Sequence, residues 1–596
     1  MKKILLSLAV LASLTASADA LKFPVAWTSV VDGGGADHAQ QVVPAADGGW
    51  FISHRFVTNG VVTLDGTPLD LSESTDYATN NSFLLVRYDA NGSPIWHIHT
   101  DWGYENDNAM CATSDGGALV ALRVSHTYNL QAQKLLSGDT LVAVKDTTGK
   151  QRVLFNQYPN ATNRQCVLIK VDSEGRIDWM HPIVVKDKTV TEGFKLLGVG
   201  EYEVNGKVVY GVAGSYTTPL ALAANDFLGS VDLDERGTSA EGIFCLTYDH
   251  NGLPVEVQAS PKDNPYNLLT LVSSASLTKA RIVGYSFSFS PLAITVALDV
   301  TGEAGSSIQV FAAGQQVGAA ALSGKADDVV VIKVDLSTLS IWSKTLVATP
   351  NSQGKSDHRP LWLDIVDGEV YITGAISGGI ALSTSASTNI VESAKAQLDG
   401  YIIGFDASGN VKGGATVGAT ISQLRKVVKG DNKIWAYGYQ MTAGGSVEQG
   451  VFMFPVNPSN FEKGTPEHIV KSAGAPTIKD CALNVDTKKF VALMGENKAG
   501  TLSDGSTLPT PTGFHSVAVG CSVNMDLNAA QMPKADAEAL VYGADGEIVV
   551  KSAGKFDYDV YNVAGQLIGK IAGENEASMK IEAGVYLVGD VKVVVK

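Results

Sequence analysis

Two Asp-His pairs and one aromatic, acidic segment are the residues of this chain whose types and spacing could support chemistry. They are Asp37 and His38, Asp357 and His358, and Trp102, Tyr104, Glu105 and Asp107. Aromatic rings stack on the apolar faces of sugars, and carboxylates accept hydrogen bonds from sugar hydroxyls. An Asp-His pair could also act as a general base. We therefore treat these eight residues as a candidate binding surface and assign no catalytic residue.

A structural role is the alternative for the same residues. An Asp or Asn recurs at this place in several of the repeats described below, so it could cap the start of a strand. The two roles differ in what the structure should contain. Convergence of both Asp-His pairs and Asp107 on one pocket would favour an enzyme, whereas residues that cap their own loops would count against one.

Neither a metal nor a cofactor is expected. The sequence has no nucleophile elbow, HExxH, P-loop, strand-helix GxGxxG or EF-hand pattern. Turns such as Asp89-Ala-Asn-Gly92 lack the downstream Glu of a calcium loop, so we interpret them as hairpin turns. The five cysteines are far apart and set in apolar strand patterns. We expect buried free thiols, with one disulfide as the alternative.

The charge and the first residues indicate an exported protein. A net charge of −16 over 596 residues argues against nucleic acid as a partner, because the phosphate backbone would be repelled. Residues 1–20 are predicted as a signal peptide, since Lys2 and Lys3 precede an apolar run and a small-residue cleavage site at Ala18-Asp19-Ala20. No later run of about 18 apolar residues follows, so no transmembrane segment is expected. We expect the protein in the periplasm, at the cell surface or secreted.

One phrase recurs seven times along the chain. It is an apolar strand that ends at an Asp or Asn, followed by a turn, and the copies end at Asp89, Asp172, Asp249, Asp335, Asp406, Asn457 and Asn524. In the Asp-x-x-Gly turns the Asp caps the backbone and the Gly supplies a positive φ. Three copies carry Trp seven residues after the Asp, at Trp96, Trp179 and Trp342. Together with Trp27, we interpret these rings as packing between neighbouring repeats.

A second phrase, a polar turn followed by an apolar strand, alternates with the first. Its seven copies begin at Asp47, Asp115, Asn205, Lys279, Asp367, Asp431 and Asp486. Each repeat therefore contains four strands, at a spacing of about 70 residues. The excess length falls in Ser/Thr/Gly/Ala-rich segments such as 383–396, which are predicted as loops. This pattern predicts an all-β fold, a seven-bladed β-propeller of four-stranded antiparallel blades over residues 21–530.

The two ends of the repeat region complement each other. The phrase around Trp27 has no turn ahead of it, and the phrase at Asn524 has no Trp strand after it. The N-terminal strand can therefore complete the last blade and remove the exposed sheet edges. The last copy is degenerate, which leaves six or eight blades as alternatives. The pattern resembles bacterial propeller repeats over residues 23–526, and this resemblance implies blade geometry but no particular activity.

Residues 536–596 do not follow the repeat and are predicted as a small β-sandwich, with strands at 547–551, 558–563, 585–588 and 591–595. The segments 560–566, 583–588 and 592–596 resemble the C-terminal sorting domain of type IX secretion in Bacteroidetes. This resemblance implies that the tail is recognised by the type IX secretion machinery. That family usually begins with a Pro-Asn-Pro type phrase, and this chain has Val-Tyr-Gly-Ala-Asp-Gly at that position, residues 541–546. A non-sorting C-terminal module is the alternative.

These features predict an exported cell-surface or secreted binding or interaction protein, with the propeller as its platform and a glycan, a peptide or a protein as its ligand. The first alternative is a secreted enzyme that degrades a polysaccharide or a peptide, with its site at the propeller funnel. The second alternative is a structural surface protein without a ligand.

Overall fold

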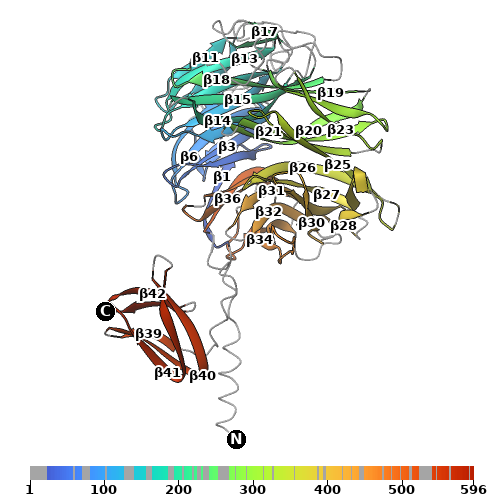
Figure 1. The fold of residues 1–596 in the computed structure, drawn as a ribbon. Helices are drawn as coiled ribbons and strands as arrows, with labels where there is room; N and C mark the ends of the chain where they lie inside the picture. Colours follow the sequence, from blue (N-terminus) through green and yellow to red (C-terminus); the bar gives the residue numbers. More distant parts are fainter. Residues whose placement is uncertain are drawn as a thin grey trace. The chain divides into compact units, whose positions relative to one another are not determined.

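The computed structural model of the chain is built from antiparallel β-strands (Figure 1). Among the described residues the one helix is the short 3-10 turn η1 (Ser383–Ser385), and none is long and apolar enough to cross a membrane. The chain divides into two compact units, 1–524 and 525–596. The structure describes residues 23–595 except 58–60, 70–80, 101–103, 126–139, 156–163, 186–193, 205–206, 218–220, 225–229, 233–239, 253–266, 275–276, 290–291, 313–314, 325–327, 353, 355, 386–387, 394–397, 419–420, 431–432, 442–448, 473–475, 485, 497, 509–512, 523–539, 545, 563–565 and 589–590.

Within its described residues, unit 1 contains seven groups of four antiparallel strands, numbered here from group 1 to group 7. Group 1 is β2 (His38–Pro44), β3 (Trp50–Val57), β6 (Asn81–Tyr88) and β7 (Pro94–Thr100). Group 2 is β8 (Tyr104–Ala112), β9 (Ala118–Ser125), β12 (Arg164–Val171) and β13 (Ile177–Val185). Group 3 is β14 (Phe194–Val204), β15 (Lys207–Thr217), β18 (Ala240–Asp249) and β19 (Asn267–Ser273). Group 4 is β20 (Leu277–Phe289), β21 (Leu292–Gly302), β24 (Asp328–Asp335) and β25 (Ser340–Thr349).

The remaining three groups complete unit 1. Group 5 is β26 (Asp357–Val366), β27 (Glu369–Leu382), β29 (Asp399–Phe405) and β30 (Val411–Thr416). Group 6 is β31 (Ile421–Lys429), β32 (Ile434–Met441), β33 (Gly450–Val456) and β34 (Glu467–Ser472). Group 7 is β35 (Thr477–Asn484), β36 (Lys489–Glu496), β38 (His515–Ser522) and β1 (Val25–Asp32). Strand β1 therefore joins the last group, with Trp27 opposite Gly520, which confirms the predicted pairing of the N-terminal strand.

The outer edges of most groups are extended by strands that belong, in sequence, to the next group. These added strands are β4 (Thr63–Leu64) and β5 (Thr67–Pro68) on β1, β10 (Thr140–Lys145) and β11 (Gln151–Phe155) on β7, β16 (Ala221–Ala224) and β17 (Ser230–Asp232) on β13, β22 (Ser307–Ala312) and β23 (Gln315–Ala321) on β19, the end of β27 with β28 (Asn389–Ser393) on β25, and β37 (Gly500–Leu502) on β34. Segment 383–396 was predicted as a loop, and this was wrong because it contains η1 and β28. Its strand satisfies its backbone by pairing with β27, next to the neighbouring group, which local sequence does not indicate.

The first strands of the seven groups contact one another in a closed circuit. Among the described residues β2 contacts β8, and the contacts continue through β14, β20, β26, β31 and β35 back to β2. Each of these strands also has a register shift against its partner, for example at Gln40 in β2 and at Arg425 in β31. Such a bulge bends a strand and increases its twist. The circuit therefore encloses a space lined by bent first strands.

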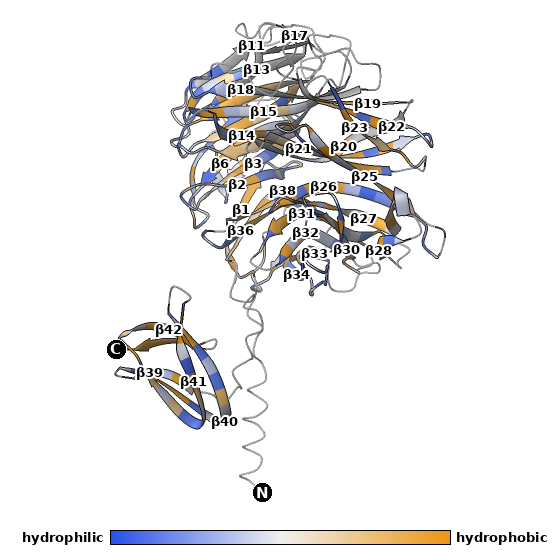
Figure 2. Cartoon of the chain, in the orientation of Figure 1, coloured by the Kyte–Doolittle hydropathy of each residue, from blue (hydrophilic) through white to orange (hydrophobic). Residues whose placement is uncertain are grey.

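The hydrophobic core lies between neighbouring groups, and Figure 2 shows hydrophobic residues along their strands. Phe51 and Phe83 of group 1, for example, cluster with Val120 and Val167 of group 2. Every residue of β29 and β33 is buried, because both faces of these strands are covered. Each fully buried Val, Leu, Ile or Phe contributes roughly 1.5–3 kcal/mol to folding. This arrangement explains why these strands read as continuous apolar runs.

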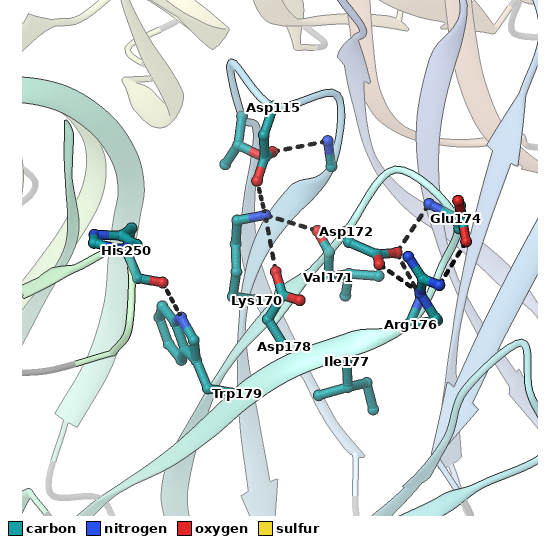
Figure 3. A network of polar contacts seen from close by, with 12 residues as sticks. Asp115, Lys170, Val171, Asp172, Glu174, Arg176, Ile177, Asp178, Trp179 and His250 are labelled. Carbon is teal, nitrogen blue, oxygen red and sulfur yellow. Dashed lines mark hydrogen bonds and ion pairs between the residues drawn. The ribbon is translucent and has the colours of Figure 1, made fainter.

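The tryptophans of the fourth strands pack against the turns of the next group, as the repeat predicts. Three indole Nε1 atoms donate to the carbonyl of the residue after a turn Asp: Trp96 to Ser173 (2.9 Å), Trp179 to His250 (3.3 Å) and Trp342 to Ala407 (3.1 Å). Figure 3 shows the second of these contacts. Trp27 stacks on Tyr88 of group 1, with ring centroids 5.8 Å apart.

Ion pairs connect the two phrases of one repeat. The Nζ atom of the buried Lys170 lies 2.7 Å from Oδ2 of Asp115 and 3.7 Å from Oδ2 of Asp178 (Figure 3). Lys170 also donates to the carbonyl of Val171 at 2.9 Å. Arg87 and Asp47 form the corresponding pair in group 1. Charged residues of the repeat thus connect the strands within groups 1 and 2.

Unit 2 is one curled five-stranded sheet in its described residues. Its strands are β39 (Leu540–Ala544), β40 (Glu547–Asn562), β41 (Leu567–Lys580), β42 (Gly584–Val588) and β43 (Val591–Val595). Ile548, Val560, Ile571 and Val593 form part of its core. The sequence prediction missed β39 and β41 and divided β40 into two strands. Strand β41 is mostly exposed and polar and so has no apolar run.

Candidate functional site

Asp37 caps two backbone segments just before β2. Its Oδ2 atom accepts a hydrogen bond from the Gly33 amide at 2.6 Å, and its Oδ1 atom accepts one from the Val57 amide at 2.8 Å. Burial raises the pKa of Asp37 to about 6, although the two amides act in the opposite direction. The carboxylate therefore holds its own loop against the end of β3.

His38 follows at the first position of β2. Its ring packs on Phe514, with centroids 5.5 Å apart. Burial, followed by repulsion from Lys479 and Arg55, lowers the pKa of His38 to about 4. The imidazole is therefore neutral at pH 7.

Asp357 and His358 begin β26 and make separate contacts. Asp357 is partly exposed and forms an ion pair with Arg359, with 2.7 Å between Oδ2 and Nη2. His358 is buried, and its Nε2 atom lies 2.7 Å from the Tyr401 hydroxyl of the same group. Strand β26 has β20 and β31 as neighbours in the circuit, whereas β2 has β8 and β35. The two Asp-His pairs therefore stand on first strands that are not adjacent.

The aromatic, acidic segment is described only in part. Trp102 lies outside the described residues, and Tyr104, Glu105 and Asp107 belong to the first half of β8, where only the backbone is described. The binding role of all eight residues stays a prediction.

A cavity of about 280 Å³ lies within the circuit, and we call it the axial cavity. Six of the seven first strands line it, from β2 through β31. Its polar and aromatic side chains are Gln41, Tyr285, Ser286, Trp362, Asp364 and Lys426. Small-molecule pockets are about 300–1,000 Å³, so this cavity is close to the lower end of that range. The sequence analysis missed these residues.

The register shifts explain why the lining residues were missed. Trp362 and Lys426 each directly follow the shifted position of their strand. A bulge changes which side chains face inward, and no turn signal in the sequence marks these bulges. The recurrence of polar residues in mid-strand, as in Trp362 and Asp364 or Arg425 and Lys426, is the one signal that could have found them.

A buried network holds the charged side of the axial cavity. Lys426 forms an ion pair with Asp480, whose Oδ2 atom also accepts from the Val42 amide at 3.0 Å. Asp364 accepts from the Val427 amide at 2.7 Å and from Nε1 of Trp362 at 3.2 Å. Burial raises the pKa of Asp364 to about 7, although Lys426 lowers it in part. At neutral pH this carboxyl is therefore partly protonated.

The aromatic side of the axial cavity is formed by Tyr285 and Trp362, whose ring centroids are 6.3 Å apart. Arg425 adds a cation to this side, with its Cζ atom 5.8 Å from the Trp362 ring centroid. The cavity thus combines ring faces with hydrogen-bonding groups.

Metal ligation and thiol chemistry have little support here. Among the described residues no group of three or more His, Cys, Asp or Glu side chains could hold a metal ion. Cys111, Cys166, Cys481 and Cys521 are free, and the last three are buried as predicted, whereas Cys111 is half-buried. Burial raises the pKa of Cys111 to about 12, so its thiol is not reactive at neutral pH.

Comparison with known proteins gives weak structural likenesses alone. No family model matches the chain, and no curated relative matches it. Similar solved structures include an ACO/RPE65 chimera, with 11% identity over 83% of this chain and 92% of that chain and a TM-score of 0.32. Others are the polysaccharide lyase Uly1 (8%, 70% and 90%, TM-score 0.25) and the rhamnogalacturonan lyase PL11 of Bacillus licheniformis (9%, 91% and 89%, TM-score 0.23). TM-scores this low transfer neither a topology nor an activity.

Proposed function

We propose that the seven groups of unit 1 are the blades of a seven-bladed β-propeller and that the protein is an exported binding or interaction protein. The closed circuit of first strands supports this fold, since a ring of four-stranded sheets in contact through their innermost strands is a propeller. The pairing of β1 with β38 supports it too, because it completes the last blade with the first described strand.

The axial cavity is the observation that carries the binding function. Six first strands converge on it, and the rings of Tyr285 and Trp362 lie beside the polar groups of Asp364 and Lys426. Ring faces combined with a few fixed polar groups suit a sugar ring, which has apolar faces and hydroxyl edges. We therefore favour a glycan over a peptide or a protein as the ligand.

We also propose that the eight residues predicted from the sequence extend this site. All of them stand at, just before or a few residues after the beginning of a first strand, in β2, β8 or β26. Equivalent ends of the first strands would lie on one side of a propeller. Asp37, His38, Trp102, Tyr104, Glu105, Asp107, Asp357 and His358 would then surround the opening of the axial cavity.

A degradative enzyme is the less favoured function. Both carboxylate oxygens of Asp364 already accept hydrogen bonds, and Lys426 is paired with Asp480. Groups engaged in this way orient a ligand more readily than they transfer its protons.

The first test of the binding function is a glycan array probed with the full chain and with a Trp362→Ala variant. We expect selective binding, with the affinity of the variant reduced about tenfold or more because a stacking surface is lost. Ile95→Ala is the control, since Ile95 is 56% exposed on β7 and should leave binding unchanged. Equal binding by all three proteins would contradict a site at Trp362.

A further inference from the structure

Basic side chains beyond the lining residue Lys426 stand on the strands around the axial cavity, in a strongly acidic chain. The net charge is −16, yet Arg425 and Lys479 stand on the neighbouring first strands β31 and β35. Arg55, on β3, lies opposite His38 of β2, and β2 is the other neighbour of β35. Three basic residues on neighbouring strands are unexpected in a chain with this net negative charge, and we therefore ask what they could bind.

Arg425 stands in the bulge of β31, beside a residue that lines the cavity. It is the shifted residue between Leu424 and Lys426, and its guanidinium lies over Trp362, a lining residue. Its Nε atom is buried and has no hydrogen-bond partner among the described residues. Burying an ionised donor without a partner costs free energy. The guanidinium is thus available to a ligand that enters the cavity.

Lys479 occupies the corresponding bulge of β35, where the register shifts between Ile478 and Cys481. Its amine is half-buried and forms no ion pair with a described residue. Burial, followed by repulsion from Arg425 and Arg55, lowers the pKa of Lys479 to about 8. The like charges are therefore close enough to destabilise one another.

The nearby carboxylates do not neutralise these two cations. Asp480 is paired with Lys426 and also accepts from Val42, and Asp364 is bound by Val427 and Trp362. Asp37, the acid close to Arg55, is held by Gly33 and Val57. His38 is near Lys479 and is neutral at pH 7. Asp480 also attracts Arg425, but it is shared with Lys426, so part of the positive charge of Arg425 and Lys479 remains unbalanced.

We propose that Arg425 and Lys479, with Arg55 nearby, form an oxyanion site at the edge of the axial cavity, so that the bound glycan carries a carboxylate or sulfate group. This inference rests on the proposed glycan-binding function. Arg425 would bind two oxygens of the anion through its planar fork, and Lys479 would contribute a point charge. The rings of Trp362 and Tyr285 would hold the sugar that bears the anion.

The test uses the full chain and three oligosaccharides of equal length in calorimetric titrations. They are oligogalacturonate, its methyl-esterified neutral form and a sulfated glucan. We expect one acidic oligosaccharide to bind at least about tenfold more tightly than the neutral one, as expected for a charge-assisted bidentate contact. A preference for the carboxylate or for the sulfate identifies the natural anion.

Variants separate the anion site from a structural role. Lys479→Met should reduce the affinity for the acidic oligosaccharide to that for the neutral one, and it should not lower the unfolding temperature without ligand, because a like-charge repulsion is removed. Arg425→Lys should keep part of the preference. Lys471→Met is the control, an exposed lysine on β34 with the same change in charge.

Two results would overturn the inference. If the neutral and acidic oligosaccharides bind equally in a Trp362-dependent manner, the glycan function stands and the oxyanion site is wrong. If Lys479→Met unfolds at a lower temperature and still prefers the acidic oligosaccharide, Lys479 has a structural role.

A third result would separate the inference from the proposed function. If no oligosaccharide binds but inorganic sulfate raises the unfolding temperature in a Lys479-dependent manner, the oxyanion site stands and the proposed glycan function is wrong.

Discussion

His54 is a residue whose ionisation bears directly on the closure of unit 1. It is fully buried in β3 of group 1, and its Nδ1 atom lies 2.7 Å from Oγ of Ser516 in group 7. Burial lowers the pKa of His54 to about 3, far below its usual 6.5. The folded chain therefore holds this imidazole neutral, at a contact between the first and last groups.

The pKa shift of His54 predicts acid sensitivity. Above pH 6.5 this histidine is neutral in both the folded and the unfolded chain, and the folded chain has its full stability. As the pH falls from 6.5 toward 3, only the unfolded chain takes up the proton, so the free energy of unfolding decreases. Between pH 7 and pH 4.5 we expect the free energy of unfolding to fall by about 2–3 kcal/mol through this residue. Denaturant unfolding of wild type and His54→Gln at the two pH values measures it. An identical loss of stability in the variant would contradict the assignment.

At the residue scale, the sequence predicted positions better than roles. The turn aspartates cap their turns as expected, for Asp172 through the amides of Glu174 and Arg176. Trp362, Asp364 and Arg425 were not predicted, because each sits on a strand whose inward-facing positions depend on a bulge. Bulges arise from packing around the circuit, which local sequence does not encode.

At the element scale, the Asp-x-x-Gly turn and the Trp of the preceding group form one unit. Gly175 has φ +81°, and a Cβ atom there would clash with Cγ2 of Thr147 and would lie 2.8 Å from Cδ2 of Trp96. Gly149, in the turn between β10 and β11, has φ +74° and open space around it. The two glycines thus differ in their neighbours and not in backbone conformation.

Gly→Ala substitution at the two turns separates strain from packing. Gly149→Ala should cost about 1 kcal/mol, the penalty of a positive φ for a residue with a Cβ atom. Gly175→Ala should cost about 1–3 kcal/mol more, because the added methyl displaces the Thr147 side chain and the Trp96 ring. Thermal unfolding of both variants measures the difference. Equal destabilisation would mean that the close packing of Thr147 and Trp96 on Gly175 contributes little.

Many strands with apolar runs were predicted, but β10 and β39 were missed although their residues are mostly apolar, and the turn predicted at Lys279 was wrong because Lys279 lies inside β20. The completely buried strand β33 stands out in the sequence, whereas β28 and β41 pair through mostly polar or exposed residues. Strand β28 forms by adding to the edge next to group 4, so its cause lies in a distant part of the chain.

At the scale of the whole molecule, the pairing of β1 with β38 could be predicted because the first and last phrases are incomplete in complementary ways. The lining of the axial cavity could not, since it collects between one and four residues from each of six strands far apart in sequence. The role of unit 2 is likewise a matter of resemblance, and we propose that it is a sorting domain for type IX secretion.

The sorting proposal predicts where the full chain and a truncated chain are found. Mass spectrometry should detect peptides from groups 1–7 outside the cell, and a chain truncated after residue 535 should stay in the periplasm. Export of the truncated chain at the wild-type level would show that unit 2 does not direct it.

The central claim is that the axial cavity is a binding site, and a crystal structure of the full chain soaked with an oligosaccharide that it binds tests this most directly. The account predicts a sugar ring against Trp362 and Tyr285, within the circuit of first strands. An oligosaccharide bound elsewhere on the chain, with no sugar in the cavity, would contradict it.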